Sequence, residues 1–176
     1  MLKIQEVIKI MKSLDEEAII KTTDPKIYVG ACLGFDLNNK FYEVSRGCNC
    51  NYNYNERLKG KTYREFLFGS RDTKYRPWDK IIHAEEDAVA HSNINNYDTA
   101  IVTRYPCDKC AQLLVYKGVK TIYYGRETEI SDYAKELFEK SEVKVIHVKE
   151  YIVDEQLGAE KVKDSLEEHK KFLRRL

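Results

Sequence analysis

Apolar residues near the N-terminus recur at steps of three and four positions. The series is Ile4, Val7, Ile8, Met11 and Leu14. This spacing places the five side chains on one face of a helix, so a helix is predicted here. The apolar residues 18–20 extend the pattern, and Pro25 is expected to end it because proline lacks the backbone N–H that a helix needs.

A different pattern follows the first helix. Residues 27–35 form a short apolar run that predicts a buried strand. Asn38, Asn39 and Lys40 are typical of a turn, and residues 41–46 are expected to return as the second strand of a hairpin. Residues 48–80 lack sustained periodicity, which indicates a long inserted loop region.

Regular alternation resumes near residue 81. Helices are expected from Ala84 to before Asn93, over 108–117 with Gly118 ending that helix, and over 131–140, and strands over 99–103, 119–124 and 143–148. Strands that alternate with helices of this length predict an α/β layer architecture with parallel strand pairs. We expect one domain over residues 1–150 and a charged, helical C-terminal extension over 151–176.

Composition narrows the classes of protein that this chain can represent. The 176 residues carry 30 Lys and Arg against 29 Asp and Glu, a net charge of +1, which disfavours a protein that coats nucleic acid. No run of about 18 apolar residues is available to span a membrane. The five cysteines are an odd number, and the first residues lack the apolar core of a signal peptide. We therefore expect a cytoplasmic protein whose cysteines are thiols or metal ligands.

Two short motifs carry candidate chemistry. His83-Ala84-Glu85 begins one predicted helix, and Pro106-Cys107-Asp108-Lys109-Cys110 begins another. One helix and one strand fit between the motifs, so an α/β sheet can bring both helix starts to the same edge. His83, Cys107 and Cys110 would then supply one imidazole and two thiolates. Three such ligands leave one position of a tetrahedral Zn²⁺ open for water, as a catalytic zinc site requires.

Glu85 lies two residues after the candidate ligand His83. A carboxyl group in that place is close enough to the metal to transfer protons without being a ligand. Neither motif is specific by itself, because a Cys-x-x-Cys pair also occurs in structural zinc sites and redox pairs. A non-catalytic zinc-binding module is thus an alternative, although structural zinc gives no reason for a carboxylate at position 85.

At these residues the chain resembles the zinc-dependent cytidine and deoxycytidylate deaminase superfamily, closest to its deoxycytidylate (dCMP) deaminase branch. The resemblance rests on Asp24-Pro25, residues 29–32, His83-Ala84-Glu85, residues 103–111 and residues 118–120. It implies a three-layer α/β fold with a five-stranded mixed sheet in the order 2-1-3-4-5 and helices on both faces. It also implies Zn²⁺ held by His83, Cys107 and Cys110, with Glu85 as the proton shuttle. The expected reaction is hydrolysis of dCMP to dUMP and ammonia.

The resemblance further implies substrate contacts and partners. The backbone of Ala84 is expected to hold the pyrimidine ring, and Asn49 is the best match to an asparagine that contacts the sugar. The branch carries Asn where this chain has Asp87, and Arg104-Tyr105 before Pro106 is an unusual pair. A homo-oligomer and control by dCTP or dTTP are expectations from the family, whereas nucleic-acid and membrane partners are not.

Several alternatives stay open from the sequence. Residues 56–80 carry eight basic residues against four acidic residues, so a cation there could hold a 5′-phosphate, or the stretch could be a solvated loop. Cys48 and Cys50 could bind a second zinc with His91, or could be free thiols. The substrate could also be a nucleoside, another aminated ring or a nucleic-acid base.

Overall fold

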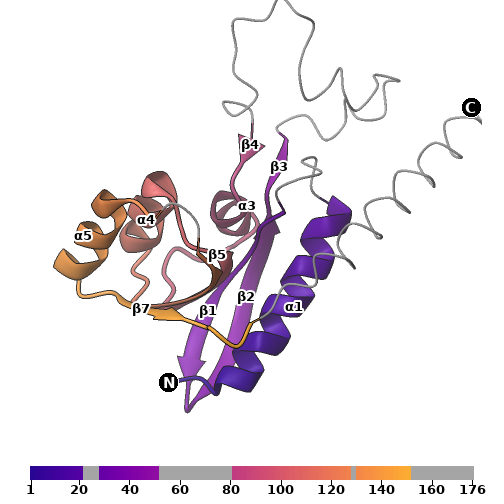
Figure 1. Ribbon diagram of the computed structural model, residues 1–176, viewed down its shortest axis with the longest axis horizontal. Coiled ribbons are helices and arrows are strands. Elements are labelled where there is room, and N and C mark those ends of the chain that lie inside the picture. Colours follow the sequence, from indigo (N-terminus) through magenta and orange to yellow (C-terminus); the bar gives the residue numbers. More distant parts are fainter. Residues whose placement is uncertain (22–27, 52–80, 128–129, 152–176) are drawn as a thin grey trace, which may run out of the picture.

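The computed structural model describes residues 1–21, 28–51, 81–127 and 130–151. In chain order these residues form α1 (Ile4–Lys21), β1 (Gly30–Leu37), β2 (Lys40–Cys48), β3 (Cys50–Asn51), β4 (Ile81–Ile82), α3 (Ala84–Ala90), β5 (Thr99–Arg104), α4 (Asp108–Tyr116), β6 (Thr121–Arg126), α5 (Asp132–Lys140) and β7 (Lys144–His147) (Figure 1). The helices and strands predicted within these ranges are confirmed, with bounds that move by a few residues.

The central sheet has five strands in the order β2-β1-β5-β6-β7. Strand β1 runs antiparallel to both of its neighbours, β2 and β5. Strands β5, β6 and β7 run parallel to one another, because a helix connects each pair. The expected mixed sheet and its strand order are thus confirmed. The short strands β3 and β4 pair separately, directly before the chain reaches α3.

Helices cover both faces of the sheet, as Figure 1 shows. Helix α1 packs on one face against a core that includes Cys32, Ile101 and Tyr123. Helices α3, α4 and α5 lie on the other face, over a larger core that includes Val102 and Ile122. Because successive residues of a strand point to opposite faces, β5 and β6 contribute side chains to both cores. The fold has three layers, as expected.

The apolar face of α1 explains its position. Val7, Met11, Leu14 and Ala18 are at most 1% exposed and lie at three- and four-residue steps. The helix approaches the sheet so closely that a Cβ added at Gly30 would lie 2.7 Å from the Cβ of Leu14. A larger residue at the start of β1 would therefore push α1 away from the sheet.

Two turns have the backbone conformation that their residues favour. Asn38 and Asn39 have φ angles of 55° and 62°, and they form the two-residue hairpin turn between β1 and β2. Gly118 has a φ of 80° and follows α4, where its N–H and that of Val119 bond back to the last carbonyls of the helix. Both turns fall where the sequence predicts them.

Two of the predicted regions lie largely outside the described residues. The inserted region 48–80 is described only up to Asn51, and the C-terminal extension only at Tyr151. Tyr151 is 7% exposed and packs in the core beneath α1, so the chain is still part of the domain core at this residue. Among the described helices, none combines the length and the apolar character needed to cross a membrane.

Candidate functional site

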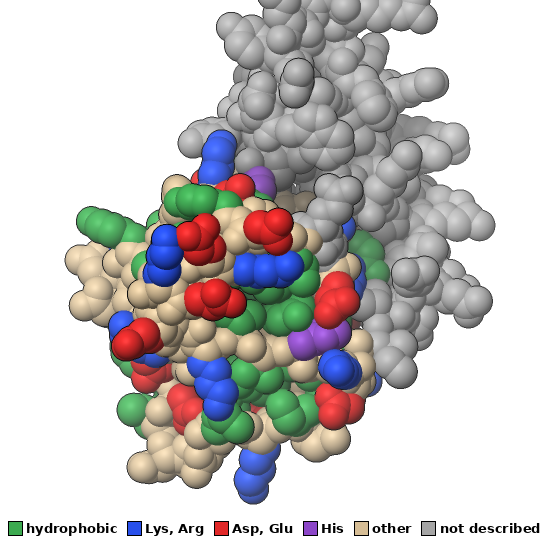
Figure 2. Space-filling model, turned by 60° about the vertical axis from the view of Figure 1, so that its left-hand side comes forward, with side chains coloured by type: hydrophobic (Ala, Val, Ile, Leu, Met, Phe, Trp, Pro, Cys, Tyr) green, Lys and Arg blue, Asp and Glu red, His purple; other side chains and the backbone are tan. Residues whose placement is uncertain are grey.

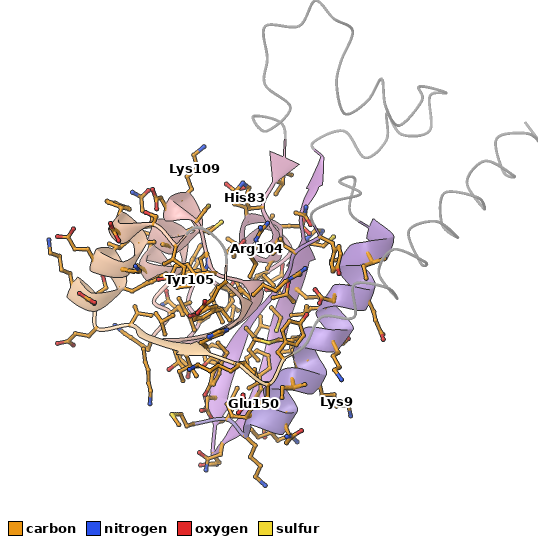
Figure 3. All side chains as sticks on the ribbon, viewed as in Figure 1. Lys9, His83, Arg104, Tyr105, Lys109 and Glu150 are labelled. Carbon is orange, nitrogen blue, oxygen red and sulfur yellow. The ribbon has the colours of Figure 1, made fainter. Side chains whose placement is uncertain are left out.

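The two sequence motifs meet at the edge of the sheet where β5 ends. His83 follows β4 and is the residue directly before α3, and Cys107 is the residue directly before α4. The backbone N–H of Tyr105 still bonds to Arg126, which holds the chain beside β6 until Pro106 redirects it. Figure 3 labels His83, Arg104, Tyr105 and Lys109 at this end of the molecule. The predicted convergence of the two helix starts is confirmed.

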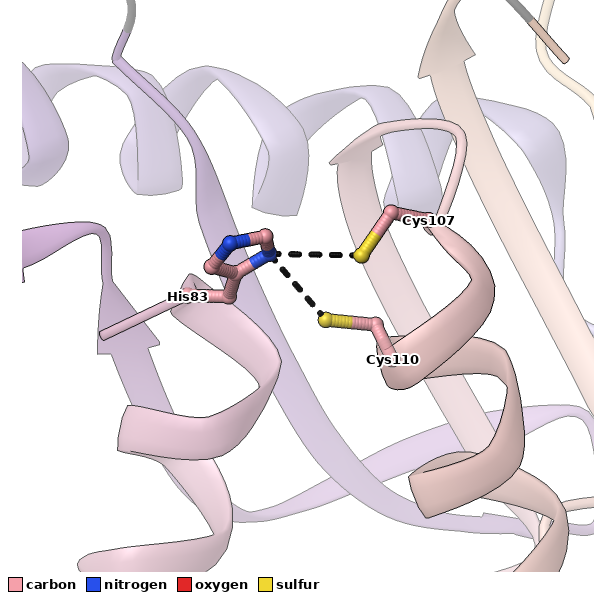
Figure 4. Close-up of side chains that lie close together, drawn as sticks. All are labelled: His83, Cys107 and Cys110. Carbon is pink, nitrogen blue, oxygen red and sulfur yellow. Dashed lines mark hydrogen bonds between the residues drawn. The ribbon is translucent and has the colours of Figure 1, made fainter. Parts of the chain in front are cut away.

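The side chains of His83, Cys107 and Cys110 form a compact group (Figure 4). The Nδ1 atom of His83 lies 3.4 Å from the sulfur of Cys107 and 3.5 Å from the sulfur of Cys110. All three candidate ligand atoms lie within 4.8 Å of one another. Ligands of a tetrahedral zinc, at their ordinary bond lengths, place nitrogen and sulfur about 3.5 Å apart. The three residues are therefore positioned to bind a zinc ion.

The electrostatics of this group suit a cation. Hydrogen bonding from Cys110 lowers the pKa of Cys107 to about 4, against the penalty of partial burial. The same bond, together with burial, raises the pKa of Cys110. The hydrogen bond to Cys107 raises the pKa of His83. The cysteine pair therefore carries a negative charge beside the imidazole, and a bound dication would favour the second thiolate as well.

Glu85 lies on the first turn of α3, next to the ligand group of His83, Cys107 and Cys110. Its side chain is 4% exposed, and burial raises the pKa of its carboxyl group. The carboxyl group also hydrogen-bonds with the thiol of Cys110, which places it beside the candidate metal ligands. A carboxyl group that is sheltered from water and readily protonated is suited to proton transfer.

The two residues expected to contact a substrate lie near α3. Ala84 is 1% exposed in the first turn of the helix, where the backbone N–H groups have no partner within the helix. Asn49 is 6% exposed and directly follows β2. Its Oδ1 accepts a hydrogen bond from the N–H of Val29 at 2.8 Å, and its own N–H donates to the Val29 carbonyl. The side-chain oxygen of Asn49 therefore fixes the backbone at Val29, just before β1.

Asp87 has a structural role that the sequence motifs do not indicate. Its Oδ2 accepts a hydrogen bond from the N–H of Cys48 at 3.0 Å, which ties α3 to the end of β2. Gly47 allows the close approach, because a Cβ there would lie 2.3 Å from the Ala88 nitrogen. Asp87 follows His83 by four residues and therefore shares its side of the helix, which is the signal that could have indicated this role.

A buried polar cluster joins the other face of the same sheet edge to α1. Arg126, at the end of β6, donates to Asp15 at 2.9 Å, to the Tyr28 carbonyl at 2.8 Å and to Thr103. The hydroxyl group of Tyr151 also donates to Asp15. No periodicity in the sequence identifies this cluster, because its members come from five separate segments. It fixes the chain that enters β1 close to Asn49.

The sequence left open a second zinc site formed by Cys48 and Cys50 with His91. His83, Cys107 and Cys110 are the group of three potential ligands found where side chains are described, and Cys48 and His91 belong to no such group there. The Nδ1 of His91 instead lies 3.3 Å from Asp87. The side chain of Cys50 lies outside the described part. The second zinc site with Cys48 and Cys50 therefore stays a prediction.

Figure 2 shows one face of the molecule. Acidic and basic side chains are interspersed across its described part, and they form no continuous basic surface there. A protein that holds a nucleic-acid strand needs a basic groove for several phosphates. The described part of this face does not supply one.

Comparison with known families agrees with the geometry. Residues 1–126 match the family described as the cytidine and deoxycytidylate deaminase zinc-binding region. This match covers more than half of the chain, and the chain belongs to that family. Zn²⁺ is accordingly the cofactor of the site formed by His83, Cys107 and Cys110.

Curated relatives resemble the chain over part of its length. The chain is 36% identical over 81 residues to ComE operon protein 2 of Bacillus subtilis, which covers 43% of each chain. It is 29% identical over 117 residues to a probable deoxycytidylate deaminase of Caenorhabditis elegans, over 60% of this chain and 50% of the relative. The human deoxycytidylate deaminase is 27% identical over 111 residues, which is 59% of this chain and 56% of that protein. The matches thus span about half the length of the curated relatives.

Solved structures share the fold. The dCMP deaminase from the cyanophage S-TIM5, in complex with dCMP and dUMP, superposes with a TM-score of 0.52 at 21% identity, over 79% of this chain and 93% of that chain. The Rib2 deaminase of Aspergillus oryzae superposes with a TM-score of 0.50 at 14% identity, over 91% of this chain and 99% of that chain. At these identities the likeness establishes the cytidine-deaminase-like fold.

Proposed function

We propose that this chain is a zinc-dependent deaminase that hydrolyses dCMP to dUMP and ammonia. The observation that carries the proposal is the buried Glu85 carboxyl group beside the His83, Cys107 and Cys110 ligand set. A structural zinc site gives no reason for a buried carboxylate that is not a ligand. Relatives named deoxycytidylate deaminase support the choice of substrate.

His83, Cys107 and Cys110 would hold Zn²⁺, which lowers the pKa of a bound water to about 7 and so supplies a nucleophile at neutral pH. Glu85 would accept a proton from the attacking water and deliver it to N3 of the cytosine ring, while the water oxygen adds to C4. Glu85 then takes the remaining hydroxyl proton and gives it to the amino group at C4. The C4–N bond breaks, ammonia leaves, and the ring becomes a uracil.

Burial of Glu85 helps this exchange. Burial raises the pKa of the carboxyl group, which favours its protonated form relative to a carboxyl group in water. The backbone N–H of Ala84 and the Nδ2 of Asn49 are the donors that we assign to the ring and the sugar of the substrate.

We also propose that residues 1–150 form the deaminase domain and that residues 151–176 extend it. Assembly into a homo-oligomer and control by dCTP or dTTP belong to this proposal, as does a location in the cytoplasm. Gel filtration coupled to light scattering and activity assays, each with and without the two nucleotides, test assembly and control. A single-chain mass and activity that neither nucleotide changes would contradict them.

The test of the proposed reaction is ammonia release by zinc-loaded protein on a substrate panel. The panel holds dCMP, CMP, deoxycytidine, cytidine, guanine and a cytosine-containing single strand. We expect dCMP to be turned over with the highest kcat/KM. A higher kcat/KM for a nucleoside, for guanine or for the oligonucleotide would contradict dCMP as the substrate. If zinc-loaded protein released no ammonia from any compound of the panel, a non-catalytic zinc-binding module would be favoured.

A further inference from the structure

The three zinc ligands come from the starts of two helices. Cys107 and Cys110 belong to the start of α4, so their relative position is set within one element. His83 comes from another element and stands directly before α3, with an extended backbone (φ −75°, ψ 156°). Its Nδ1 faces both sulfurs, as Figure 4 shows. The geometry of the ligand group therefore depends on how the backbone of His83 is held at the start of α3.

Glu86 holds this backbone. The N–H of His83 donates a hydrogen bond to Oε2 of Glu86, with 2.9 Å between nitrogen and oxygen. The carbonyl of His83 accepts the N–H of Asp87, also at 2.9 Å. A glutamate in the third position of a helix that reaches back to the N–H of the residue before the helix is one half of a capping box. In this helix, the residue that the glutamate holds is a metal ligand.

The strand that leads to His83 gives it little support. Strand β4 has two residues, and within the described chain it pairs with the equally short β3. The hydrogen bond to Glu86 lies in a partly buried place, where water competes less for the N–H group. Because rotation of the His83 backbone would move the imidazole away from the sulfurs, we expect this hydrogen bond to be a main restraint on the position of Nδ1.

We propose that Glu86 is a positioning residue of the zinc site, which fixes the backbone of His83 so that Nδ1 faces the sulfurs of Cys107 and Cys110. A residue that orients a ligand contributes to metal affinity although it does not touch the metal. The role needs an acceptor oxygen at the right reach, and it does not need a charge. The proposal rests on the zinc site and is independent of dCMP as the substrate.

The test measures zinc affinity by competition with a chromophoric chelator. The visible absorption of the cobalt(II)-substituted protein reports the coordination geometry in parallel. We expect Glu86→Ala to weaken zinc binding on the order of 10- to 100-fold and to change the cobalt spectrum. Glu86→Gln keeps an acceptor oxygen at the same reach, so its zinc affinity should stay within about threefold of the wild type.

Glu86→Asp separates reach from charge. It keeps the carboxyl group on a side chain that is shorter by one methylene group, so its oxygen no longer reaches the N–H of His83 at the same geometry. We expect its zinc affinity to lie closer to that of Glu86→Ala than to that of Glu86→Gln. A role of the charge alone predicts the opposite order of the Asp and Gln variants.

Ser131→Ala is the matched control. Ser131 precedes α5, and its Oγ accepts the N–H groups of Tyr133 and Ala134. Ser131→Ala and Glu86→Ala each remove a helix cap, so each should lower the Tm of the zinc-free protein by about 2–4 °C. Because none of the three ligands lies on α5, Ser131→Ala should keep the zinc affinity and the cobalt spectrum of the wild type.

The outcomes decide between positioning and capping. Wild-type zinc affinity and an unchanged cobalt spectrum in Glu86→Ala would overturn the proposal and leave Glu86 with the role of a helix cap. Tight zinc binding by Glu86→Asp together with weak binding by Glu86→Gln would also overturn it, because the charge would then be the important property. A wild-type protein that binds no zinc would refute the zinc site itself and the role of Glu86 with it.

Discussion

The carboxylate of Asp87 accepts a hydrogen bond from the backbone N–H of Cys48, with 3.0 Å between oxygen and nitrogen. This contact joins the helix that begins after His83 to the segment that presents Asn49. At Gly47 the end of β2 packs directly against the backbone of α3, with no room for a side chain between them. The position of Asn49 relative to Glu85 therefore depends on Asp87, although Asp87 itself belongs to neither motif.

Replacing Asp87 is expected to weaken substrate binding. Asp87→Ala removes the acceptor of the Cys48 N–H, so the segment with Asn49 loses its fixed position. We predict that KM for dCMP rises on the order of 10-fold while kcat changes by less than about threefold. Asp87→Asn keeps an acceptor oxygen and should remain close to the wild-type values. Steady-state kinetics at fixed zinc content provide the measurement.

Asp98→Ala is the control for this variant. Asp98 also accepts a backbone hydrogen bond, from Asp36 at 2.9 Å, but it lies before the start of β5, at the other end of the strand from the site. We expect it to lower the free energy of unfolding without changing KM. If Asp87→Ala and Asp98→Ala have the same kinetics, Asp87 has no positioning role.

We predict that zinc content depends on the three ligands His83, Cys107 and Cys110. His83→Ala or Cys110→Ala removes one of three protein ligands, which leaves too few to hold zinc tightly. The wild-type protein should hold about one zinc per chain after dialysis, and each variant much less. Atomic absorption measures this directly. Wild-type zinc content in His83→Ala would show that the metal is bound elsewhere.

The raised pKa of Asp15 predicts that the free energy of unfolding depends on pH. Burial is the main reason that its pKa rises from 3.8 to about 6, although Arg126 and Thr103 act in the opposite direction. Between these two values the folded protein retains a proton that the unfolded chain releases. The contribution of Asp15 to stability is therefore present below about pH 4 and is lost as the pH rises through about 6, by about 3 kcal/mol at most.

The variant Asp15→Asn isolates this effect, because its side chain does not titrate. Urea unfolding of both proteins from about pH 3.5 to about pH 7 gives the difference in free energy of unfolding at each pH. We expect the wild type to lose stability relative to Asp15→Asn as the pH rises through this range. A difference that does not change with pH would contradict a raised pKa at Asp15.

Two helix ends provide a paired test of backbone conformation. Gly118 after α4 has a φ of 80°, and Glu142 after α5 has a φ of 55° in the same kind of turn. A left-handed backbone is costly for residues other than glycine. We predict that Gly118→Ala lowers the free energy of unfolding by about 1 kcal/mol, whereas Glu142→Gly leaves it unchanged or raises it by up to about 1 kcal/mol. Equal losses in both variants would contradict the role of glycine in these turns.

The sequence predicts local elements and the metal ligands well, because both depend on short-range patterns. The helix that begins after His83 and the turn at Gly118 follow from periodicity and from single residues with special backbone preferences. The strand order follows from the family resemblance, since no local pattern specifies which strands are neighbours.

Contacts between distant segments could not be predicted. The hydrogen bond from Arg126 to Asp15 joins residues that are 111 positions apart, and nothing in their local sequences marks them as partners. The same holds for Asn49 and Val29, whose pairing depends on the geometry of the β1–β2 hairpin. Long-range polar contacts of this kind appear only once the chain is folded.

The central claim is that Glu85 transfers protons in a zinc-dependent deamination of dCMP. The most direct measurement compares ammonia release from dCMP by the wild type and by Glu85→Gln, with the zinc content of both determined in the same samples. We predict equal zinc content, formation of dUMP with one ammonia by the wild type, and a loss in kcat of about 10²- to 10⁴-fold in the variant. A zinc-loaded Glu85→Gln protein that deaminates dCMP at the wild-type rate would contradict this role of Glu85.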